Sequence, residues 1–250
     1  MARKRKTEFW KNVRTLVNSS DIILEILDAT NIRETRNEEM KKKVMLKGKA
    51  LIFVINKSDL ADKSKLKDET KDLHPKVFVS MKDREGIGKL WGMIMMQAKR
   101  KNKEEPVVGM FGYPNVGKSS ILNSLKGRKS AKTSAEAGYT KNLEYVRCGN
   151  IMLIDSPGVI PYGEMDTAKH ISIGAKNPDK IRNPIQIAEK IIKEGGGKIE
   201  KHFGVEAKED PFDTIDAIAM KKGLLKKGGL PDTRGAAVFI LMQIHRKKIK

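Results

Sequence analysis

The segment PVVGMFGYPNVGKSS, residues 106–120, limits the possible folds of this chain more than any other, because an apolar strand candidate leads directly into a glycine-containing loop and a helix. In that setting the spacing Gly112-x4-Gly117-Lys118-Ser119 predicts a P-loop. Backbone N–H groups of such a loop surround phosphates, its lysine reaches the β and γ phosphates, and its serine hydroxyl binds magnesium. The motif by itself does not distinguish ATP from GTP.

A second motif, Asn56-Lys57-Ser58-Asp59, lies earlier in the chain at the end of the apolar run KALIFVINK. A carboxylate at Asp59 can accept hydrogen bonds from the N1–H and the exocyclic amine of guanine, and adenine presents no such pair of donors. Asn56 would hold the base edge and brace the phosphate loop, and the Lys57 stem would cover one face of the base. Alone this is an ordinary polar turn, but beside a P-loop it indicates GTP.

Two further motifs complete a nucleotide site. Asp155 ends the apolar run IMLID and begins the sequence Asp-Ser-Pro-Gly. Asp155 would bind magnesium through water, and the Gly158 N–H would face the γ phosphate. Thr140 precedes this segment and is the expected second hydroxyl for magnesium; Thr133 and Ser134 are weaker alternatives. Alone, Asp-x-Pro-Gly is a common turn.

Ser80-Met81-Lys82 follows the strand candidate 76–80, where the Met81 N–H could meet the guanine O6. We expect GTP or GDP to be bound by Asn56, Lys57, Asp59, Ser80, Met81, Lys82, Tyr113, Pro114, Asn115, Val116, Gly117, Lys118, Ser119, Ser120, Thr140, Asp155 and Gly158. The expected catalytic groups are Lys118, Thr140 and Gly158, and the expected magnesium ligands are Ser119, Thr140 and Asp155.

Strand and helix patterns alternate through the first part of the chain, which predicts an α/β fold with a doubly wound, mostly parallel sheet. A turn signal at Gly149-Asn150 predicts a hairpin that adds one antiparallel strand. After about residue 178 only helical patterns occur, starting at Asn183, Asp210 and Asp232. We therefore predict a GTPase domain over 1–178 and a small, basic, all-α domain over 179–250 that binds RNA.

The charge of the chain is strongly positive, with a formal net charge of +20 from 51 Lys and Arg against 31 Asp and Glu. Such a surplus favours polyanionic partners, either nucleic acid or an anionic membrane, although a solvated lysine-rich surface is the plainer alternative. Basic runs occur at 3–6, around 221–227 and at 246–250. A single cysteine, the absence of an apolar stretch behind MARKRK and the lack of a long apolar segment predict a cytoplasmic protein with no membrane span.

The motif order N-K-S-D, S-M-K, G-Y-P-N-V-G-K-S, T, D-S-P-G resembles that of translation-factor-like GTPases, circularly permuted. With its helical C-terminal part, the chain resembles the YlqF/RbgA family of ribosome-assembly GTPases over nearly its whole length, including SSDIILEILDATNIRETRN and GGLPDTRGAAVFILMQIHRKK. It departs from the family in the Ala-Gly-Tyr before Thr140, where relatives commonly have Pro-Gly, and in Met81, where alanine is usual.

The resemblance implies a GTP-hydrolysing assembly factor that binds ribosomal RNA in the precursor of the large subunit, and we expect it to be a monomer. Val159 stands where Ras-like enzymes have glutamine, so hydrolysis should be slow without an activator or should use another group. Asn115 resembles the asparagine through which some of these GTPases bind potassium, and an ordinary turn residue is an equal alternative. The rival functions are a GTPase switch that signals to a protein or membrane surface, and a P-loop ATPase.

Overall fold

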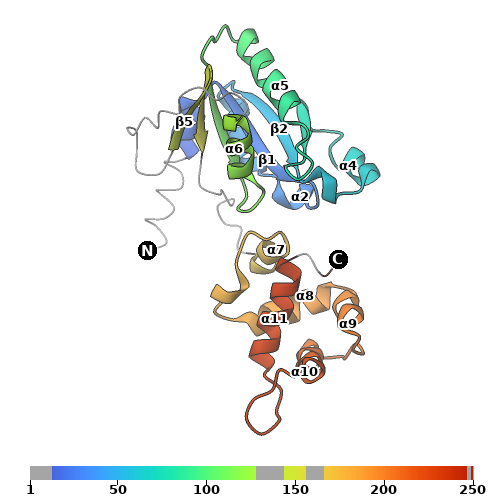
Figure 1. The fold of residues 1–250 in the computed structure, drawn as a ribbon. Helices are drawn as coiled ribbons and strands as arrows, with labels where there is room; N and C mark the ends of the chain where they lie inside the picture. The colour runs from blue at the N-terminus through green and yellow to red at the C-terminus, as the bar shows by residue number, and fades with distance from the viewer. Residues whose placement is uncertain (1–12, 128–143, 156–165, 247–248, 250) are drawn as a thin grey trace. The chain divides into compact units, whose positions relative to one another are not determined.

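The computed structural model describes residues 13–127, 144–155, 166–246 and 249. The chain divides into two compact units, Met1–Glu164 and Met165–Lys250. The first unit is built on a six-stranded sheet in the order β3-β2-β1-β4-β6-β5 (Figure 1). The strands are β1 (Ile22–Asp28), β2 (Ala50–Asn56), β3 (Lys76–Val79), β4 (Val107–Gly112), β5 (Glu144–Cys148) and β6 (Ile151–Asp155). All neighbouring pairs are parallel except β5 with β6, which confirms the predicted mostly parallel fold with one antiparallel edge.

Helices cover both faces of the sheet. One face carries a helix at 13–19, α2 (Ile32–Thr35), α3 (Glu38–Leu46) and α4 (Lys63–Glu69), whose apolar side chains share buried clusters with β1 and its neighbours. The other carries α5 (Ile87–Arg100) and α6 (Lys118–Gly127), which contact each other and the strands. Every residue of β1 is buried, as expected for a central strand covered on both faces.

The strand order reverses between β1 and β4. These two strands are hydrogen-bonded in parallel, although β2, β3 and the helices from α2 to α5 separate them in sequence. The connection from α5 to β4 is short and is attached to the start of β1. Asp21 accepts a hydrogen bond from the Val107 N–H at 2.9 Å and pairs with Lys103 at 3.3 Å. This local connection brings the strand before the P-loop next to the first strand of the chain.

The second unit is helical and consists of α7 (Thr167–Ser172), the 3-10 helix η2 (Pro178–Lys180), α8 (Pro184–Glu194), α9 (Lys198–Phe203), α10 (Pro211–Lys222) and α11 (Thr233–His245). Asp210 and Asp232 cap their helices as expected, since each carboxylate accepts a backbone N–H of the first turn. A core of isoleucine, alanine, leucine and phenylalanine side chains joins α8, α10 and α11. The helix α7 packs on α8 and α11, so this unit begins before the predicted boundary at 178.

Packing selects which face of a helix is buried. The helix α5 buries Ile87, Leu90, Ile94 and Ala98 and leaves Met96 44% exposed. In α7, the polar side chain of His170 is buried.

Glu25 is a buried acid in the middle of β1 and carries a testable pH dependence. Its Oε1 accepts the Asn37 N–H at 2.8 Å, and burial raises its pKa from 4.5 to about 7, with Glu38 adding to the increase and Arg36 and Lys41 opposing it. Because the folded state holds the proton more tightly, the contribution of Glu25 to stability is greatest below pH 4.5 and is lost as the pH rises through 7. A shift of this size corresponds to about 3 kcal/mol.

We expect Glu25→Gln to remove most of this loss. Urea unfolding between pH 5 and pH 8.5 should show the native chain losing stability relative to the variant as the pH increases. Glu39→Gln, on the half-exposed side of α3, is the matched control and should leave the slope unchanged. Parallel pH profiles for the native chain and Glu25→Gln would contradict the assignment.

Candidate nucleotide site

The predicted motifs meet at the carboxyl ends of the strands. β1 ends at Asp28, β2 ends at Asn56, β4 ends at Gly112 and β6 ends at Asp155, and these four strands are adjacent in the sheet. The reversal of strand order between β1 and β4 lies among them. In open α/β sheets, ligands bind outside the carboxyl ends of the strands at such a switch point.

Lys118 begins α6 and folds back over the P-loop. Its Nζ donates to the carbonyl oxygens of Gly112 at 3.1 Å and Tyr113 at 2.9 Å, and the residue is only 8% exposed. Burial lowers the pKa of the Lys118 ammonium, and the Asp155 carboxylate offsets part of that decrease. A desolvated ammonium held by two carbonyls can exchange those contacts for the stronger acceptors of a phosphate.

Asn56 joins the guanine motif to the P-loop. Its Nδ2 donates to the Val116 carbonyl at 2.8 Å, and the side chain is buried. Gly117 follows in the left-handed region at φ 98°, and a Cβ there would lie 2.1 Å from Asn56 Nδ2. Glycine is therefore required at this position both by its backbone angle and by the close approach of the Asn56 amide.

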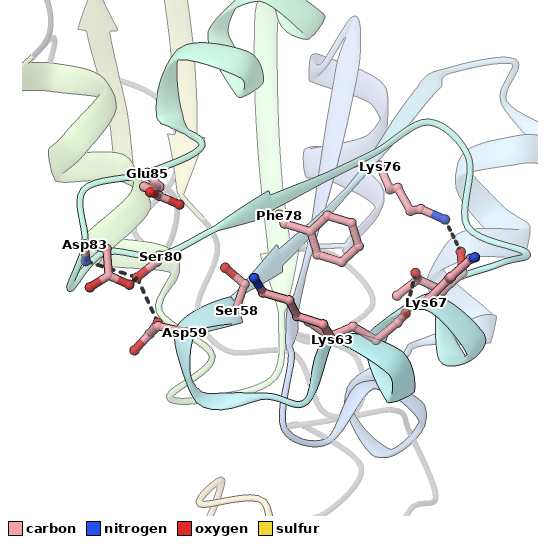
Figure 2. Close-up of a pocket in the computed structure, with 11 residues that line it drawn as sticks. Ser58, Asp59, Lys63, Lys67, Lys76, Phe78, Ser80, Asp83 and Glu85 are labelled. Carbon is pink, nitrogen blue, oxygen red and sulfur yellow. Dashed lines mark hydrogen bonds between the residues drawn. The ribbon is translucent and has the colours of Figure 1, made fainter.

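Asp59 lies on the 3-10 helix η1 (Ser58–Leu60) and is exposed. Its Oδ1 is 2.8 Å from the hydroxyl of buried Ser80, which also lies 3.1 Å from Asp83 Oδ2 and accepts the Asp83 N–H at 3.0 Å. Figure 2 shows these groups at one end of a pocket of about 530 Å³ that Phe78 and, from α4, Lys63 and Lys67 also line. Ser80 thus orients the carboxylate through its side chain, and Asp83 is a supporting residue that the sequence interpretation missed.

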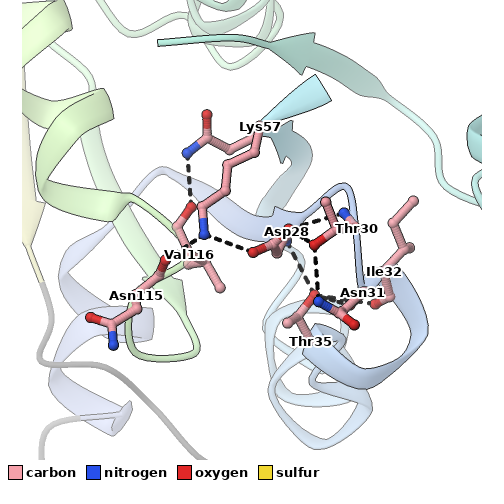
Figure 3. A network of polar contacts seen from close by, with 9 residues as sticks. Asp28, Thr30, Asn31, Ile32, Thr35, Lys57, Asn115 and Val116 are labelled. Carbon is pink, nitrogen blue, oxygen red and sulfur yellow. Dashed lines mark hydrogen bonds and ion pairs between the residues drawn. The ribbon is translucent and has the colours of Figure 1, made fainter. Parts of the chain in front are cut away.

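Lys57 adopts the left-handed conformation at φ 62° and its ammonium has two anchors (Figure 3). Nζ lies 2.7 Å from Asp28 Oδ2 and donates to the Asn115 carbonyl at 2.8 Å. Asn115 is itself in the left-handed region at φ 62°, which turns this carbonyl within the loop. Asp28 was not among the predicted site residues, because a single aspartate at the end of a strand matches no motif.

The other predicted residues in the described part of the chain lie around the same loops. Tyr113 and Val116 are buried within the P-loop, Pro114 is half-buried, and Ser119 and Ser120 are exposed in the first turn of α6. Met81 is half-buried and its sulfur accepts the Ser124 hydroxyl at 3.2 Å, whereas Lys82 is exposed. Thr140, Gly158 and Val159, with the alternatives Thr133 and Ser134, lie outside the described residues.

A hydroxyl at Ser119 and a carboxylate at Asp155 are hard oxygen donors of the kind that Mg²⁺ prefers. Asp155 ends β6, the neighbour of the strand β4 that leads into the phosphate loop. The donor set therefore fits a magnesium ion shared with a phosphate. Over the described ranges, no group of three His, Cys, Asp or Glu residues could hold a metal ion by itself.

The basic run of the second unit is exposed. Lys221 and Lys222 end α10, where Lys221 Nζ donates to the Gly204 carbonyl and Lys222 lies 5.7 Å from the Phe203 ring centroid. Lys226 and Lys227 lie in the exposed loop before α11, and Arg246 follows that helix. Residues 3–6, 247, 248 and 250 lie outside the described residues. None of the helices that the structure describes is both long and apolar enough to cross a membrane.

The sheet, its switch point and the P-loop at the end of β4 define a P-loop GTPase fold in which the guanine motif precedes the phosphate loop, so the fold is circularly permuted. Residues 107–195 match the family model described as 50S ribosome-binding GTPase. The uncharacterized GTP-binding protein MJ1464 of Methanocaldococcus jannaschii is 38% identical over 99% of this chain and 67% of its own length. The chain belongs to the circularly permuted GTPase family that includes YlqF.

Other relatives are longer than this chain. Nucleolar GTP-binding protein 2 of Neurospora crassa is 33% identical over 96% of the chain, which spans only 40% of that protein. The structure of GNP-bound YlqF from T. maritima matches with a TM-score of 0.61 and 21% identity, covering 95% of this chain and 93% of that one. This likeness confirms the predicted fold.

Proposed function

We propose that the chain binds GTP and GDP at the carboxyl edge of β1, β2, β4 and β6 and hydrolyses GTP. The observation that carries this proposal is the pair of contacts between the two motifs, Asn56 to Val116 and Lys57 to Asn115. Two consecutive residues of the guanine motif hold two consecutive carbonyls of the phosphate loop, so base recognition and phosphate recognition are part of one rigid arrangement. An ATPase in which Asp59 is incidental would not need this connection.

Within this site we assign Asp59 to the N1–H and amine of guanine, the Met81 N–H to O6, and the Lys57 stem to one face of the base. The loop Tyr113 to Ser120 would surround the phosphates, with Lys118 on the β and γ groups. Ser119 and Asp155 would hold magnesium, which stabilises the charge of the phosphates when bound. Thr140 keeps its predicted role as the second hydroxyl for magnesium, and the Gly158 N–H keeps its predicted role at the γ phosphate.

We further propose that the protein binds ribosomal RNA in the large-subunit precursor and acts as a nucleotide-dependent assembly factor. Support comes from the matching model of a 50S ribosome-binding GTPase, from the net charge of +20 and from the exposed lysines around α10. Few aromatic residues lie among these lysines, so contacts to phosphate fit better than stacking on bases.

Sedimentation with isolated large subunits tests this function. The protein should co-sediment in the presence of a non-hydrolysable GTP analogue, less so with GDP, and increasingly weakly as salt rises. Replacing Lys221, Lys222, Lys226 and Lys227 together with glutamine should weaken the association. The matched control is the same change at Lys42, Lys47, Lys99 and Lys101, four lysines of the first unit that do not line the pocket at Asp59. Equal binding with both nucleotides, or none at all, would favour a switch that acts on another partner.

Asn115 leads to a separate prediction about potassium. If its side chain supplies an oxygen to a potassium ion beside the phosphates, GTP hydrolysis should be several-fold faster in potassium than in sodium. Asn115→Ala should remove this difference. Asn102→Ala should not, because this left-handed asparagine lies in the turn between α5 and the amino end of β4, whereas the P-loop follows the carboxyl end of β4. Equal rates of the native protein in sodium and potassium would make Asn115 a turn residue only.

A further inference from the structure

We propose that Asp28 is a positioning residue of the nucleotide site, which acts by holding the Lys57 side chain in place before and during nucleotide binding. This inference rests on the proposed GTP binding and adds to it a residue outside the recognised motifs. Asp28 ends β1 at the switch point, with β2 on one side and β4 on the other. It is 1% exposed, so its carboxylate has lost nearly all contact with bulk water.

Both oxygens of the Asp28 carboxylate have defined partners. Oδ1 accepts the Thr30 N–H at 2.9 Å and the Thr30 hydroxyl at 2.6 Å, and Oδ2 pairs with Lys57 Nζ at 2.7 Å. The Asp28 N–H donates to the Thr35 hydroxyl at 3.2 Å, which ties the turn of α2 to the same point (Figure 3). These contacts hold the carboxylate in one orientation, with one oxygen directed at Lys57.

Lys57 is the only member of this network that also reaches the phosphate loop, as far as the described residues show. Its ammonium lies between Asp28 Oδ2 and the Asn115 carbonyl, so the tip of the side chain joins the end of β1 to the P-loop. A long flexible side chain that is held at its tip loses little further freedom when a base packs against its stem. Asp28 thereby prepares the surface on which guanine rests.

The opposite end of β1 provides a matched control. Asp21 also accepts a backbone N–H, from Val107, and also pairs with a lysine, Lys103. It therefore has the same chemistry and joins β1 to β4, but it lies at the amino end of the strands. A purely structural role of Asp28 predicts similar consequences for Asp21→Asn and Asp28→Asn, whereas a positioning role predicts that only Asp28→Asn changes nucleotide affinity.

The test is the affinity of purified full-length variants for GDP and IDP, measured by titration calorimetry together with the unfolding midpoint. We expect Asp28→Asn to weaken both nucleotides by the same factor of about ten, because the loss of one charge-assisted contact at Lys57 does not involve the guanine amine. In a Lys57→Met background, Asp28→Asn should cause no further loss. Asp21→Asn should leave both affinities unchanged.

The proposal is wrong if Asp28→Asn folds and binds GDP like the native protein, or if its effect adds fully to that of Lys57→Met. Should Asp28→Asn fail to fold, Thr30→Val removes one hydrogen bond to Oδ1 and must still weaken GDP binding two- to five-fold; unchanged affinity there also overturns the proposal. Failure of the native protein to bind GDP would instead refute the proposed function.

Discussion

Asp59→Asn is expected to weaken GDP binding by about a thousand-fold, since two hydrogen bonds to a charged acceptor are lost or weakened. In the structure the carboxylate is held by Ser80, so the introduced amide would occupy the same position. Its N–H group would then face the exocyclic amine of guanine, donor against donor. Xanthine has a carbonyl at that position, so the variant should bind XDP more tightly than GDP.

Calorimetry with GDP, XDP and ADP measures this change of specificity. Asp62→Asn is the matched control, because Asp62 is a nearby exposed aspartate that caps α4 through the N–H groups of Ser64 and Lys65. Asparagine caps helices as well as aspartate does, so stability and GDP affinity should both be retained. If Asp59→Asn kept its preference for GDP over XDP, Asp59 would not be the guanine contact.

Lys118→Met is expected to reduce GTP hydrolysis about a hundred-fold or more, because it removes a preorganised cation from the developing charge on the phosphates. The same change should leave the nucleotide-free protein as stable as before or more stable. Lys118 is buried with a lowered pKa, so at neutral pH its charged form costs the folded state free energy. This cost decreases as the pH rises toward 10.5, where the unfolded chain also loses the proton.

Single-turnover hydrolysis and urea unfolding without nucleotide at pH 7 and pH 9.5 test both parts. The stability advantage of Lys118→Met should be larger at pH 7 than at pH 9.5. Lys126→Met, in the last turn of the same helix α6, is the control and should change neither hydrolysis nor the pH dependence. A variant that hydrolyses GTP normally would remove Lys118 from the catalytic groups.

Much of this site could be predicted because its parts are local. A P-loop is a strand, a turn and a helix within a few residues, and the guanine motif is a short turn after a strand, so Lys118 and Asp59 are recognisable from their neighbours along the chain. The parallel arrangement then implied that the strand ends meet. The structure confirms that sheet, while the ligand contacts of the individual residues stay predictions.

Residues whose environment comes from distant segments were not predictable in this way. Asp83 gains its role only because the loop after β3 folds back onto Ser80. In the sequence, Glu25 is a polar residue within an apolar strand. Its pKa is raised because α3 covers that position and buries the carboxyl group. The buried face of α5 also depends on its neighbours, because several adjacent faces of this helix are apolar and the strands beneath it decide which one is covered.

By itself, the sequence determined the kinds of elements, the alternation of strands and helices, and the motifs at the strand ends, since each depends on side chains close together in the chain. The tertiary structure decided that β1 lies between β2 and β4, and therefore that Asp28 faces Lys57 at the switch point of the sheet. The role of a buried carboxylate depends on the cation that it faces. Here that cation is brought by another strand, which no local pattern around Asp28 encodes.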